Sequence, residues 1–403
     1  MKNINNKFCA APFTSLYEGQ FGRISACCAM ATELGNSNHS DLKEIFNNEK
    51  FTAIRKSFLE NKFPKECKSC KQFEEQNNVI ANVRESASDF AGDKLKTALK
   101  YTNPDGTLSK QIPVFLDLLW SNKCNFACMG CNGELSSTIA TKYSEAYSIA
   151  NQSKINTKLW ENNNQKKIDY ILEHKDSINL IHLNGGEPFM QKEIYEFLEV
   201  LLENNLHKTI KIWSHTNGSI TRYQKKDIID DYLCHWGENC TITVSHDGHG
   251  TKGEYTRYGL KQDKWIKNVQ RMIDKNIHVN LQTCYNMFNA LEISELYNWY
   301  NNHTDIDPCD RSITVWHSPF IFSPKMLHLD KNLLAKANSE LDNLEQIENI
   351  NWNIEELRLI LNTPPNQKHL IKQKELFRKS IEKFDELRKT NFQKTFPELK
   401  SII

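Results

Sequence analysis

No window of the 403-residue sequence approaches 18 uncharged apolar residues, so we expect no membrane-spanning helix. The first residues, MKNINNKF, lack an apolar run behind their charges, so we expect no signal peptide and a cytoplasmic protein. Net charge is almost absent as well, since 51 Lys and Arg residues stand against 50 Asp and Glu residues. The chain therefore lacks the basic excess typical of nucleic-acid-binding proteins, which argues against a nucleic-acid partner.

Cysteine, by contrast, is abundant and unevenly placed. Eight of the twelve cysteines lie within the first 131 residues. Without an export signal, disulfides are disfavoured and clustered cysteines indicate metal or redox chemistry. The remaining four have no metal-ligand spacing, and we expect them to be buried small apolar side chains. They are Cys234, Cys240, Cys284 and Cys309.

From residue 112 onward, short apolar runs alternate with helix-period segments. This alternation predicts β/α units and a parallel sheet. The six predicted strands are 114–120, 178–184, 210–216, 241–247, 278–284 and 312–317, with helices near 136–150, 191–204, 224–233, 262–275 and 292–302. Residues 101–111 are expected to form a linker, and residues 330–403 two or three amphipathic helices with a break at 362–367.

The segment CNFACMGC, residues 124–131, directly follows the first predicted strand and has the spacing C-x3-C-x2-C. A [4Fe–4S] cluster normally takes four thiolates, so three would leave one iron with the open position that catalysis requires. Zinc is an alternative, with Cys128-x2-Cys131 and Cys67-x2-Cys70 as its two halves, although it leaves Cys124 unexplained. Three unrelated buried thiols are the third possibility.

Three later strands also end in polar or glycine-rich segments. They are Asn-Gly-Gly-Glu-Pro at 184–188, Thr-Asn-Gly at 216–218 and Ser-His-Asp-Gly at 245–248. In β/α barrels function gathers at the carboxyl ends of the strands, so these segments are expected to converge on the cysteine loop. Taken singly, each is also ordinary turn chemistry. His246 and His249 could form a metal pair, but solvated turn histidines are the favoured interpretation.

The four motifs, in this order on successive strands, resemble the radical S-adenosylmethionine (SAM) superfamily. The resemblance implies an α/β fold with a partial (β/α)6, TIM-like barrel over residues 112–325. It also implies that Cys124, Cys128 and Cys131 hold a catalytic [4Fe–4S] cluster whose open iron is chelated by SAM. In that superfamily one electron then cleaves SAM, and the resulting 5′-deoxyadenosyl radical abstracts hydrogen from a substrate, so we expect the same reaction here.

Further site residues follow from the same resemblance. SAM binding is expected at Gly185, Gly186, Glu187, Pro188, Thr216, Asn217 and Ser245, with Glu187 accepting from the SAM amine. Many relatives carry an aromatic residue over the adenine just before the third cysteine; here that position is Gly130, and Phe126 or Met129 would cover the adenine instead. Arg257 could meet a carboxylate of SAM or substrate, or form a surface ion pair.

The earlier cysteines resemble the first half of the SPASM pattern, which corresponds to a shorter "twitch" domain. Residues 1–100 would form this module and precede the barrel, whereas such modules usually follow it. The resemblance implies one auxiliary [4Fe–4S] cluster held by Cys9, Cys27, Cys67 and Cys70, with Cys28 as the alternative to Cys27 and zinc as the alternative metal. Residues 326–403 would form a C-terminal helical region, expected to be a supporting cap.

By analogy with SPASM and twitch relatives, the expected substrate is a peptide or protein side chain. The alternatives are a small molecule, such as a sugar or nucleotide derivative, or a non-catalytic iron–sulfur electron-transfer protein. An external electron donor of the flavodoxin or ferredoxin type would be a partner.

Overall fold

The computed structural model describes residues 7–75 and 83–403, and the chain divides into two compact units, each assembled from several segments. The first comprises Met1–Ser121, Trp160–Gly185 and Lys192–Ser214. The second comprises Asn122–Leu159, Gly186–Gln191 and His215–Ile403. The domain boundaries proposed near residues 100, 112 and 326 stay predictions.

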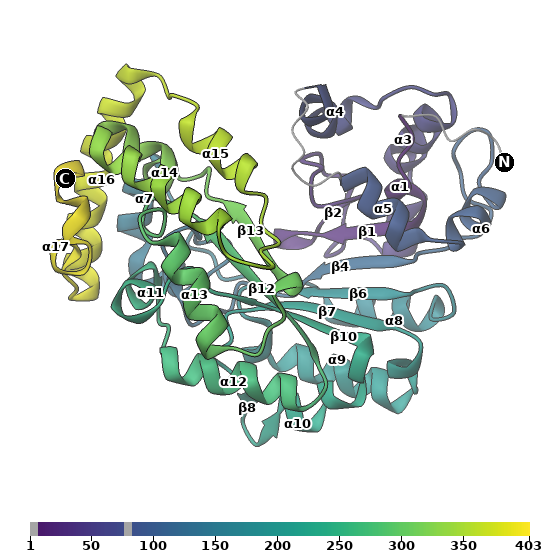
Figure 1. The fold of residues 1–403 in the computed structure, drawn as a ribbon. Coiled ribbons are helices and arrows are strands. Elements are labelled where there is room, and N and C mark those ends of the chain that lie inside the picture. The colour runs from purple at the N-terminus through teal and green to yellow at the C-terminus, as the bar shows by residue number, and fades with distance from the viewer. Residues whose placement is uncertain (1–6, 76–82) are drawn as a thin grey trace. The chain divides into compact units, whose positions relative to one another are not determined.

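The first unit is built on a mostly parallel sheet with the strand order β7-β6-β4-β1-β2-β3 (Figure 1). Three strands of the predicted β/α series, β4, β6 and β7, are parallel neighbours, and β1 continues the parallel run beside β4. The cysteine-rich N-terminal segment therefore contributes a strand to this sheet, which the sequence did not reveal. The strands are β1 (Ser15–Glu18), β2 (Arg23–Ser25), β3 (Gly35–Asn36), β4 (Phe115–Leu119), β6 (Leu180–Asn184) and β7 (Lys211–Thr216).

In the described part of the first unit, eight α-helices accompany this sheet. They are α1 (Ala11–Thr14), α2 (Leu42–Phe46), α3 (Glu49–Leu59), α4 (Lys68–Glu75), α5 (Val83–Ala91), α6 (Lys94–Lys100), α8 (Asn164–Glu173) and α9 (Lys192–Glu203). The segment predicted as a linker is packed rather than free, because buried Arg55 of α3 donates to the carbonyl of Gly106 at 3.0 Å.

The two faces of this sheet differ in chemistry because successive side chains of a strand point to opposite faces. Leu116, Ile181 and Ile212 are in register across β4, β6 and β7 and are buried, forming an apolar face. The next row, Tyr17, Asp117, His182 and Trp213, lies on the other face. There Asp117 Oδ1 lies 3.1 Å from His182 Nδ1, and the His182 ring stacks on Trp213 at a centroid distance of 3.9 Å.

The second unit contains the other half of the predicted β/α series. Its parallel strands have the order β13-β12-β10, and two short antiparallel pairs, β5 with β11 and β8 with β9, accompany them. The strands are β5 (Ala127–Cys128), β8 (Arg222–Tyr223), β9 (Lys226–Asp227), β10 (Cys240–Ser245), β11 (Arg257–Tyr258), β12 (His278–Tyr285) and β13 (Arg311–Val315).

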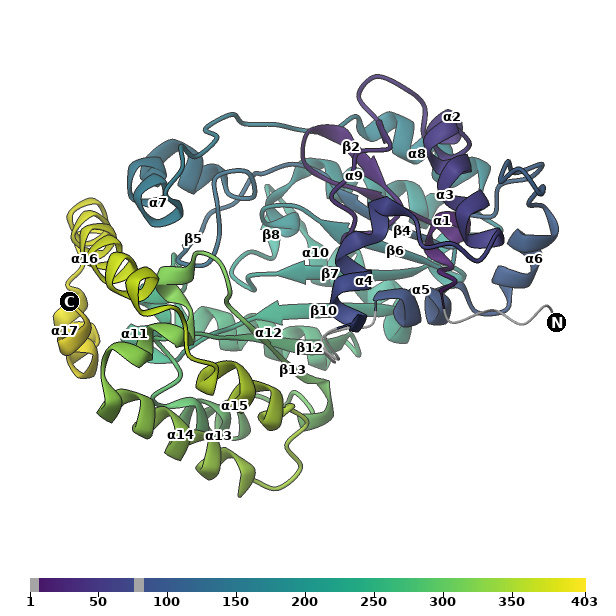
Figure 2. The same ribbon diagram turned by 90° about the horizontal axis from the view of Figure 1, so that it is seen from above.

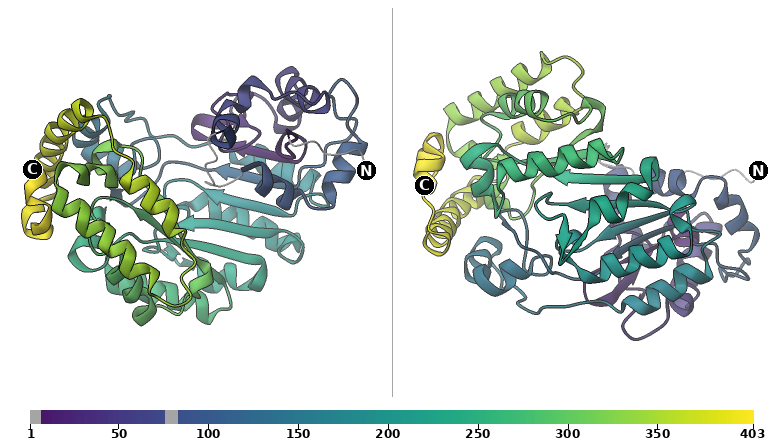
Figure 3. Two further views of the ribbon diagram at one scale, coloured as in Figure 1. Left: turned by 45° about the horizontal axis from the view of Figure 1, so that its top comes forward. Right: turned by 90° about the horizontal axis from the view of Figure 1, so that it is seen from below.

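The helices of the second unit include the predicted C-terminal region, coloured yellow-green to yellow in Figures 1 to 3. Here α14 packs on α13 and α15, while the long α16 runs along α7. The α-helices are α7 (Ser144–Asn151), α10 (Ile228–Asp231), α11 (Gly250–Thr256), α12 (Gln262–Asp274), α13 (Ile293–His303), α14 (Lys331–Glu345), α15 (Ile354–Asn362), α16 (Gln367–Arg388) and α17 (Phe392–Thr395).

All six predicted strands are present, and the predicted α/β class of mostly parallel sheet with covering helices is confirmed. Helices α8 and α11 were not anticipated. None of the helices in the described part of the chain has both the length and the apolar character that crossing a bilayer requires.

A fully buried ion pair lies in the first unit. Lys167 of α8 and Glu18 of β1 are both 0% exposed, with Nζ 2.8 Å from Oε2. Ser37 donates its hydroxyl to Glu18, and the Lys167 ammonium lies 4.3 Å from the centroid of the Trp120 ring. Each charge is thus compensated inside the protein, as a buried ion requires.

Removing one partner of this ion pair should destabilise the protein, because the other charge stays buried. We expect Lys167→Met to lower the free energy of unfolding by about 3–5 kcal/mol, because it leaves the Glu18 carboxylate buried without a cation. The double variant Glu18→Leu/Lys167→Met should recover much of that loss. Lys43→Met, which breaks an exposed pair with Glu173, should cost less than about 1 kcal/mol. Urea denaturation of the four proteins measures these differences, and equal losses in both single Lys variants would contradict this account.

Candidate functional site

The cysteine loop at 124–131 is held by hydroxyl groups that follow it in the chain. Thr138 donates to the carbonyl of Cys124 at 2.7 Å, and Ser136 donates to the carbonyl of Phe126 at 2.6 Å. The amide of Cys124 in turn donates to the hydroxyl of Ser137 at 3.0 Å. The loop backbone is therefore fixed by the Ser-Ser-Thr segment just before the next helix.

Two side chains from distant parts of the second unit support the same loop. Tyr147 of α7 donates its hydroxyl to the carbonyls of Ala127 and Cys128, at 2.8 and 2.6 Å. Arg388, at the end of α16, donates to the carbonyl of Ala127 at 2.6 Å and to the Tyr147 hydroxyl at 3.0 Å. Tyr147 was not singled out from the sequence, because nothing in its local pattern marks it. The C-terminal region thus reaches the cysteine loop directly.

The three thiols of the loop are close enough to influence one another's ionisation. Burial is the main cause that raises the pKa of Cys124, and the neighbouring Cys131 and Cys128 add to it. Burial and Cys128 likewise raise the pKa of Cys131 to about 12. Burial thus disfavours the thiolate forms of Cys124 and Cys131, and bound iron would supply the positive charge that favours them.

This donor set fits an iron–sulfur cluster. Among residues 7–75 and 83–403, no three His, Cys, Asp or Glu side chains converge on a single metal position. A cluster of four irons takes one thiolate per iron, so its ligands need not converge on one point. Three partly or fully buried thiols on one short, rigid loop meet that requirement.

The Gly-Gly-Glu-Pro segment packs directly on the cysteine loop. A Cβ at Gly186 would lie 2.4 Å from the carbonyl oxygen of Lys123, so only glycine allows this approach. The amide of Glu187 donates to the same carbonyl at 2.7 Å. Pro188 is buried and opens a short 3-10 helix. The motif therefore fixes the backbone just ahead of Cys124.

Glu187 links this segment to the Thr-Asn-Gly turn. Its carboxylate accepts from the Thr216 hydroxyl and the Asn217 amide, both at 2.7 Å, and from the Phe189 amide at 3.1 Å. Burial raises the pKa of Glu187 to about 7, and these hydrogen bonds oppose the rise. Both carboxylate oxygens are thus engaged by protein donors, and the expected contact with a SAM amine stays a prediction.

A further link joins the turn to the cysteine loop. Asn217 donates its side-chain amide to Asn125 Oδ1 at 2.9 Å, and Asn125 donates to the hydroxyl of Ser219 at 2.9 Å. The loop, the Gly-Gly-Glu-Pro segment and the turn therefore form one hydrogen-bonded assembly. Asn125, which lies between the first two cysteines, was missed by sequence reasoning. Ser245 ends β10, is partly exposed and precedes Asp247 by two residues.

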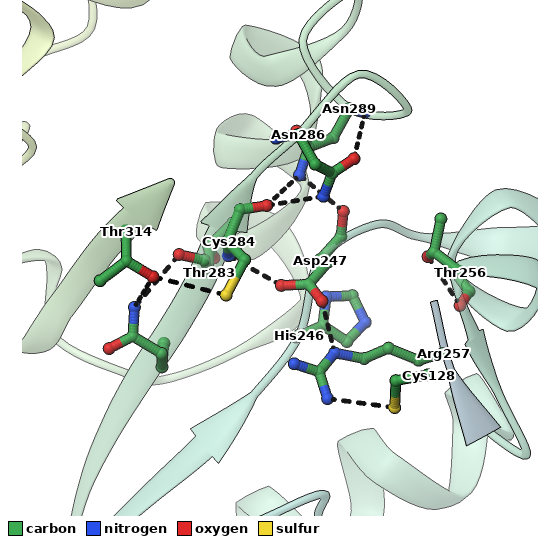
Figure 4. Close-up of polar contacts among 12 residues, drawn as sticks. Cys128, His246, Asp247, Thr256, Arg257, Thr283, Cys284, Asn286, Asn289 and Thr314 are labelled. Atoms are coloured by element: carbon green, nitrogen blue, oxygen red, sulfur yellow. Dashed lines mark hydrogen bonds and ion pairs between the residues drawn. The ribbon is translucent and has the colours of Figure 1, made fainter. Parts of the chain in front are cut away.

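Arg257 forms a buried ion pair rather than a surface one, and the expected contact with a carboxylate of SAM or substrate stays a prediction. Its Nε donates to Asp247 Oδ2 at 2.7 Å, and the Asp247 side chain is 0% exposed (Figure 4). Its Nη1 lies 3.7 Å from Cys128 Sγ. The predicted surface pairing is therefore wrong: Asp247 is a buried partner, and it turns the guanidinium toward a cysteine of the loop.

The space beside Gly130 is filled by an aromatic ring from elsewhere in the second unit. A Cβ at Gly130 would lie 2.4 Å from Cε2 of Trp316, which directly follows β13. Phe126 and Met129, the residues proposed to cover the adenine, are both buried. An aromatic ring is thus present at this position, supplied by a residue that the sequence did not point to.

In the first unit, the four cysteines proposed for the auxiliary site gather around one small cavity. Its lining consists of Cys9, Ala11, Pro12, Ala26, Cys27, Met30, Cys67, Cys70 and Arg84. Burial followed by Cys9 and Cys70 raises the pKa of Cys67 to about 12. Cys28 lines a different cavity, with Tyr17 and Arg23. The geometry therefore favours Cys27 over Cys28 as the fourth thiol.

Three of the other cysteines and one of the two turn histidines, His246, differ from expectation, whereas His249 is partly exposed. Only Cys240 of the four ungrouped cysteines is buried; Cys234 and Cys284 are partly exposed, and Cys309 is exposed. Neither a solvated turn residue nor half of a metal pair, His246 is fully buried and stacks on Trp299 at 5.2 Å. It also contacts the Tyr300 hydroxyl at 3.2 Å.

The buried histidine predicts an acid sensitivity of the second unit. Burial lowers the pKa of His246 to about 3, so the folded chain keeps it neutral while the unfolded chain binds a proton below about pH 6.5. The contribution of neutral His246 to the free energy of unfolding is thus present above pH 6.5 and lost as the pH falls. Between pH 6.5 and 5 we expect a loss of about 2 kcal/mol that His246→Phe does not show.

Urea denaturation at both pH values measures this difference. The exposed His303 provides the matched control, and His303→Phe should keep the pH dependence of the wild type. An identical pH dependence in wild type and His246→Phe would contradict the assignment.

Comparisons with known proteins identify two iron–sulfur regions. The SPASM family, described as an iron–sulfur cluster-binding domain, matches residues 9–71. A second family, described as a 4Fe–4S single cluster domain, matches residues 115–235. These regions contain the auxiliary cysteines and the cysteine loop, so the predicted SPASM-type character and the two iron–sulfur regions are confirmed. No curated protein matches the chain significantly.

Among solved structures, the chain is similar to native anSMEcpe with bound AdoMet, at 16% identity and a TM-score of 0.38, covering 58% of this chain and 59% of that one. It is also similar to Streptococcus suis SuiB bound to precursor peptide SuiA, at 16% identity and a TM-score of 0.40, covering 77% and 64%. SuiB bound to S-adenosylmethionine matches at 18% identity and a TM-score of 0.40, covering 75% and 62%. The chain spans less than two thirds of each of these proteins.

Proposed function

We propose that the protein is a radical SAM enzyme with an auxiliary [4Fe–4S] cluster. The observation that carries the proposal is the assembly around the cysteine loop, where the Gly-Gly-Glu-Pro segment and the Thr-Asn-Gly turn are hydrogen-bonded to the loop. Each of these two segments alone is common turn chemistry. Both pack on one three-cysteine loop, and this arrangement suits a cluster with one open iron and a chelating ligand.

In this proposal Cys124, Cys128 and Cys131 hold the catalytic cluster. When bound, the cluster supplies the electron that cleaves SAM, and SAM supplies the 5′-deoxyadenosyl radical that removes hydrogen from the substrate. The chain's own contribution is to orient these groups and to exclude water, since the cofactors carry the difficult chemistry.

The SAM-binding residues are proposed to act through the same assembly. Gly185, Gly186, Glu187 and Pro188 shape the backbone beside the cluster, while Thr216, Asn217 and Ser245 present polar groups to SAM. Trp316 fills the position where relatives place an aromatic residue, and we assign to it the covering of the adenine.

The auxiliary cluster is proposed on Cys9, Cys27, Cys67 and Cys70. Four thiolates close its coordination, which favours electron transfer or a structural role over substrate binding. The SPASM-type module supports a peptide or protein side chain as substrate, and the partner that supplies electrons would be of the flavodoxin or ferredoxin type. A small-molecule substrate is the alternative for the same site. We also propose that the protein is cytoplasmic.

The direct test combines iron content with SAM cleavage. Under a strong reductant we expect reconstituted protein to release 5′-deoxyadenosine and to hold about eight irons. The Cys124→Ala/Cys128→Ala/Cys131→Ala variant should keep about four irons and release no 5′-deoxyadenosine. Cys234→Ala/Cys309→Ala, which removes two cysteines outside both sites, should behave as wild type. Iron-loaded wild type that releases no 5′-deoxyadenosine would instead favour an electron-transfer protein.

The choice between the adjacent Cys27 and Cys28 gives a second test. Only Cys27 lines the cavity with the other three thiols, so Cys27→Ser should lose about four irons while Cys28→Ser keeps the wild-type content. Mössbauer spectra and zinc analysis of both variants measure the outcome. Zinc in place of iron, or equal losses from the two variants, would contradict the auxiliary assignment.

A further inference from the structure

We propose that Arg257 is a positioning residue whose guanidinium sets the reduction potential of the cluster at Cys124, Cys128 and Cys131. This inference rests on the proposed function, because it assumes that the loop holds the catalytic cluster. It adds a residue that lies outside the four motifs and that directs its charge at one of the cluster's ligands.

The backbone first fixes where Arg257 can be. Strand β11 pairs antiparallel with β5, and in that register Arg257 lies directly opposite Cys128. The amide of Met129 donates to the carbonyl of Thr256 at 2.8 Å, extending the pairing by one step. The arginine is therefore anchored to the cysteine loop itself and would follow any movement of it.

The side chain is then held by a buried carboxylate. Arg257 Nε donates to Asp247 Oδ2 at 2.7 Å, and Asp247 Oδ1 accepts from the amide of Cys284 at 2.7 Å (Figure 4). Asn289 donates to the backbone carbonyl of Asp247 at 3.0 Å. Both carboxylate oxygens are thus occupied, and the planar guanidinium has one fixed orientation, with Nη1 turned toward Cys128.

The contact that results has a defined electrostatic effect. Arg257 Nη1 lies 3.7 Å from Cys128 Sγ; the Arg257 side chain is 11% exposed, and Cys128 is partly buried. Charges interact more strongly away from water, and hydrogen bonds to ligand sulfurs help to set cluster potentials. A cation at the sulfur stabilises the reduced cluster, which carries one more negative charge, and so raises the potential. Asp247 offsets part of this effect but lies on the far side of the guanidinium.

The charge of Arg388 also acts on Cys128, but its hydrogen bonds go to other atoms of the loop. Arg388 donates to the carbonyl of Ala127 at 2.6 Å and contacts the sulfur of Met129, which is not a proposed ligand. Arg388 therefore acts on the backbone of the loop, whereas Arg257 acts on a ligand sulfur. Of the two arginines, Arg257 is the one in hydrogen-bond contact with a proposed ligand sulfur.

The test is a redox titration monitored by electron paramagnetic resonance on full-length reconstituted protein without SAM. The wave that disappears in Cys124→Ala/Cys128→Ala/Cys131→Ala identifies the core cluster. We expect Arg257→Met to shift the midpoint of this wave to a more negative potential, with unchanged iron content. Arg257→Lys, which keeps the charge but cannot reach Asp247 and Cys128 together, should give an intermediate shift.

Arg271 provides the matched control. It pairs with Asp227 and Asp230 at 3.0 and 2.7 Å in the same unit, and Arg271→Met should leave the midpoint unchanged. An unshifted midpoint in Arg257→Met, or an equal shift in Arg271→Met, would overturn the proposal. So would loss of the core cluster from both Arg257 variants, since the residue would then serve cluster assembly.

These outcomes are distinguishable from failure of the proposed function. The potentials are measured without SAM, so a shifted midpoint in Arg257→Met supports this inference even if wild type releases no 5′-deoxyadenosine. Absence of a core-cluster wave in the wild type would overturn both together.

Discussion

The second unit depends on one constraint: a loop of eight residues must present three thiols in a fixed arrangement although it has almost no regular structure of its own. Segments of the chain outside the loop hold it in place. Gly186 brings a second backbone within contact of the residue before Cys124, Asn217 reaches Asn125 inside the loop, and β11 pairs with its middle. Hydrogen bonds from Ser136, Thr138 and Tyr147 to carbonyls of the loop add to these contacts, and such support gives the rigidity that a functional site requires.

The sequence predicted the frame of the fold well because its signals are local. Six apolar runs bounded by turn residues correspond to β4, β6, β7, β10, β12 and β13. The contribution of β1 to the first sheet could not be predicted, because a four-residue strand beside cysteines has no period that distinguishes it from a loop. Helix α8 was missed for a similar reason, since its polar first turn, Asn-Gln-Lys-Lys, hides the apolar stripe that follows.

The candidate site likewise contains residues that a local sequence pattern marks and residues that it does not. Cys124, Cys128 and Cys131 are recognisable by spacing, and Gly186 by the motif around it. Asp247 lies within a recognised motif, but its partner Arg257 is ten residues away, and whether that arginine points to solvent or to a buried carboxylate is decided only by tertiary packing. Trp316 carries no local signal at all, because its importance comes from what lies beside it in space.

The C-terminal region also makes a contact with the cysteine loop that tertiary packing decides. From its composition it was expected to be a supporting helical cap, and its exposed faces are indeed rich in surface ion pairs. Yet the last residue of α16 is a buried arginine whose guanidinium bonds a carbonyl within the cysteine loop, 261 positions earlier in the chain. Because that carbonyl also accepts from Tyr147, the position of the loop depends on how α16 packs along α7. The tail is therefore a structural part of the region around the cysteine loop, and removing it would remove the hydrogen bonds of Arg388 to that loop.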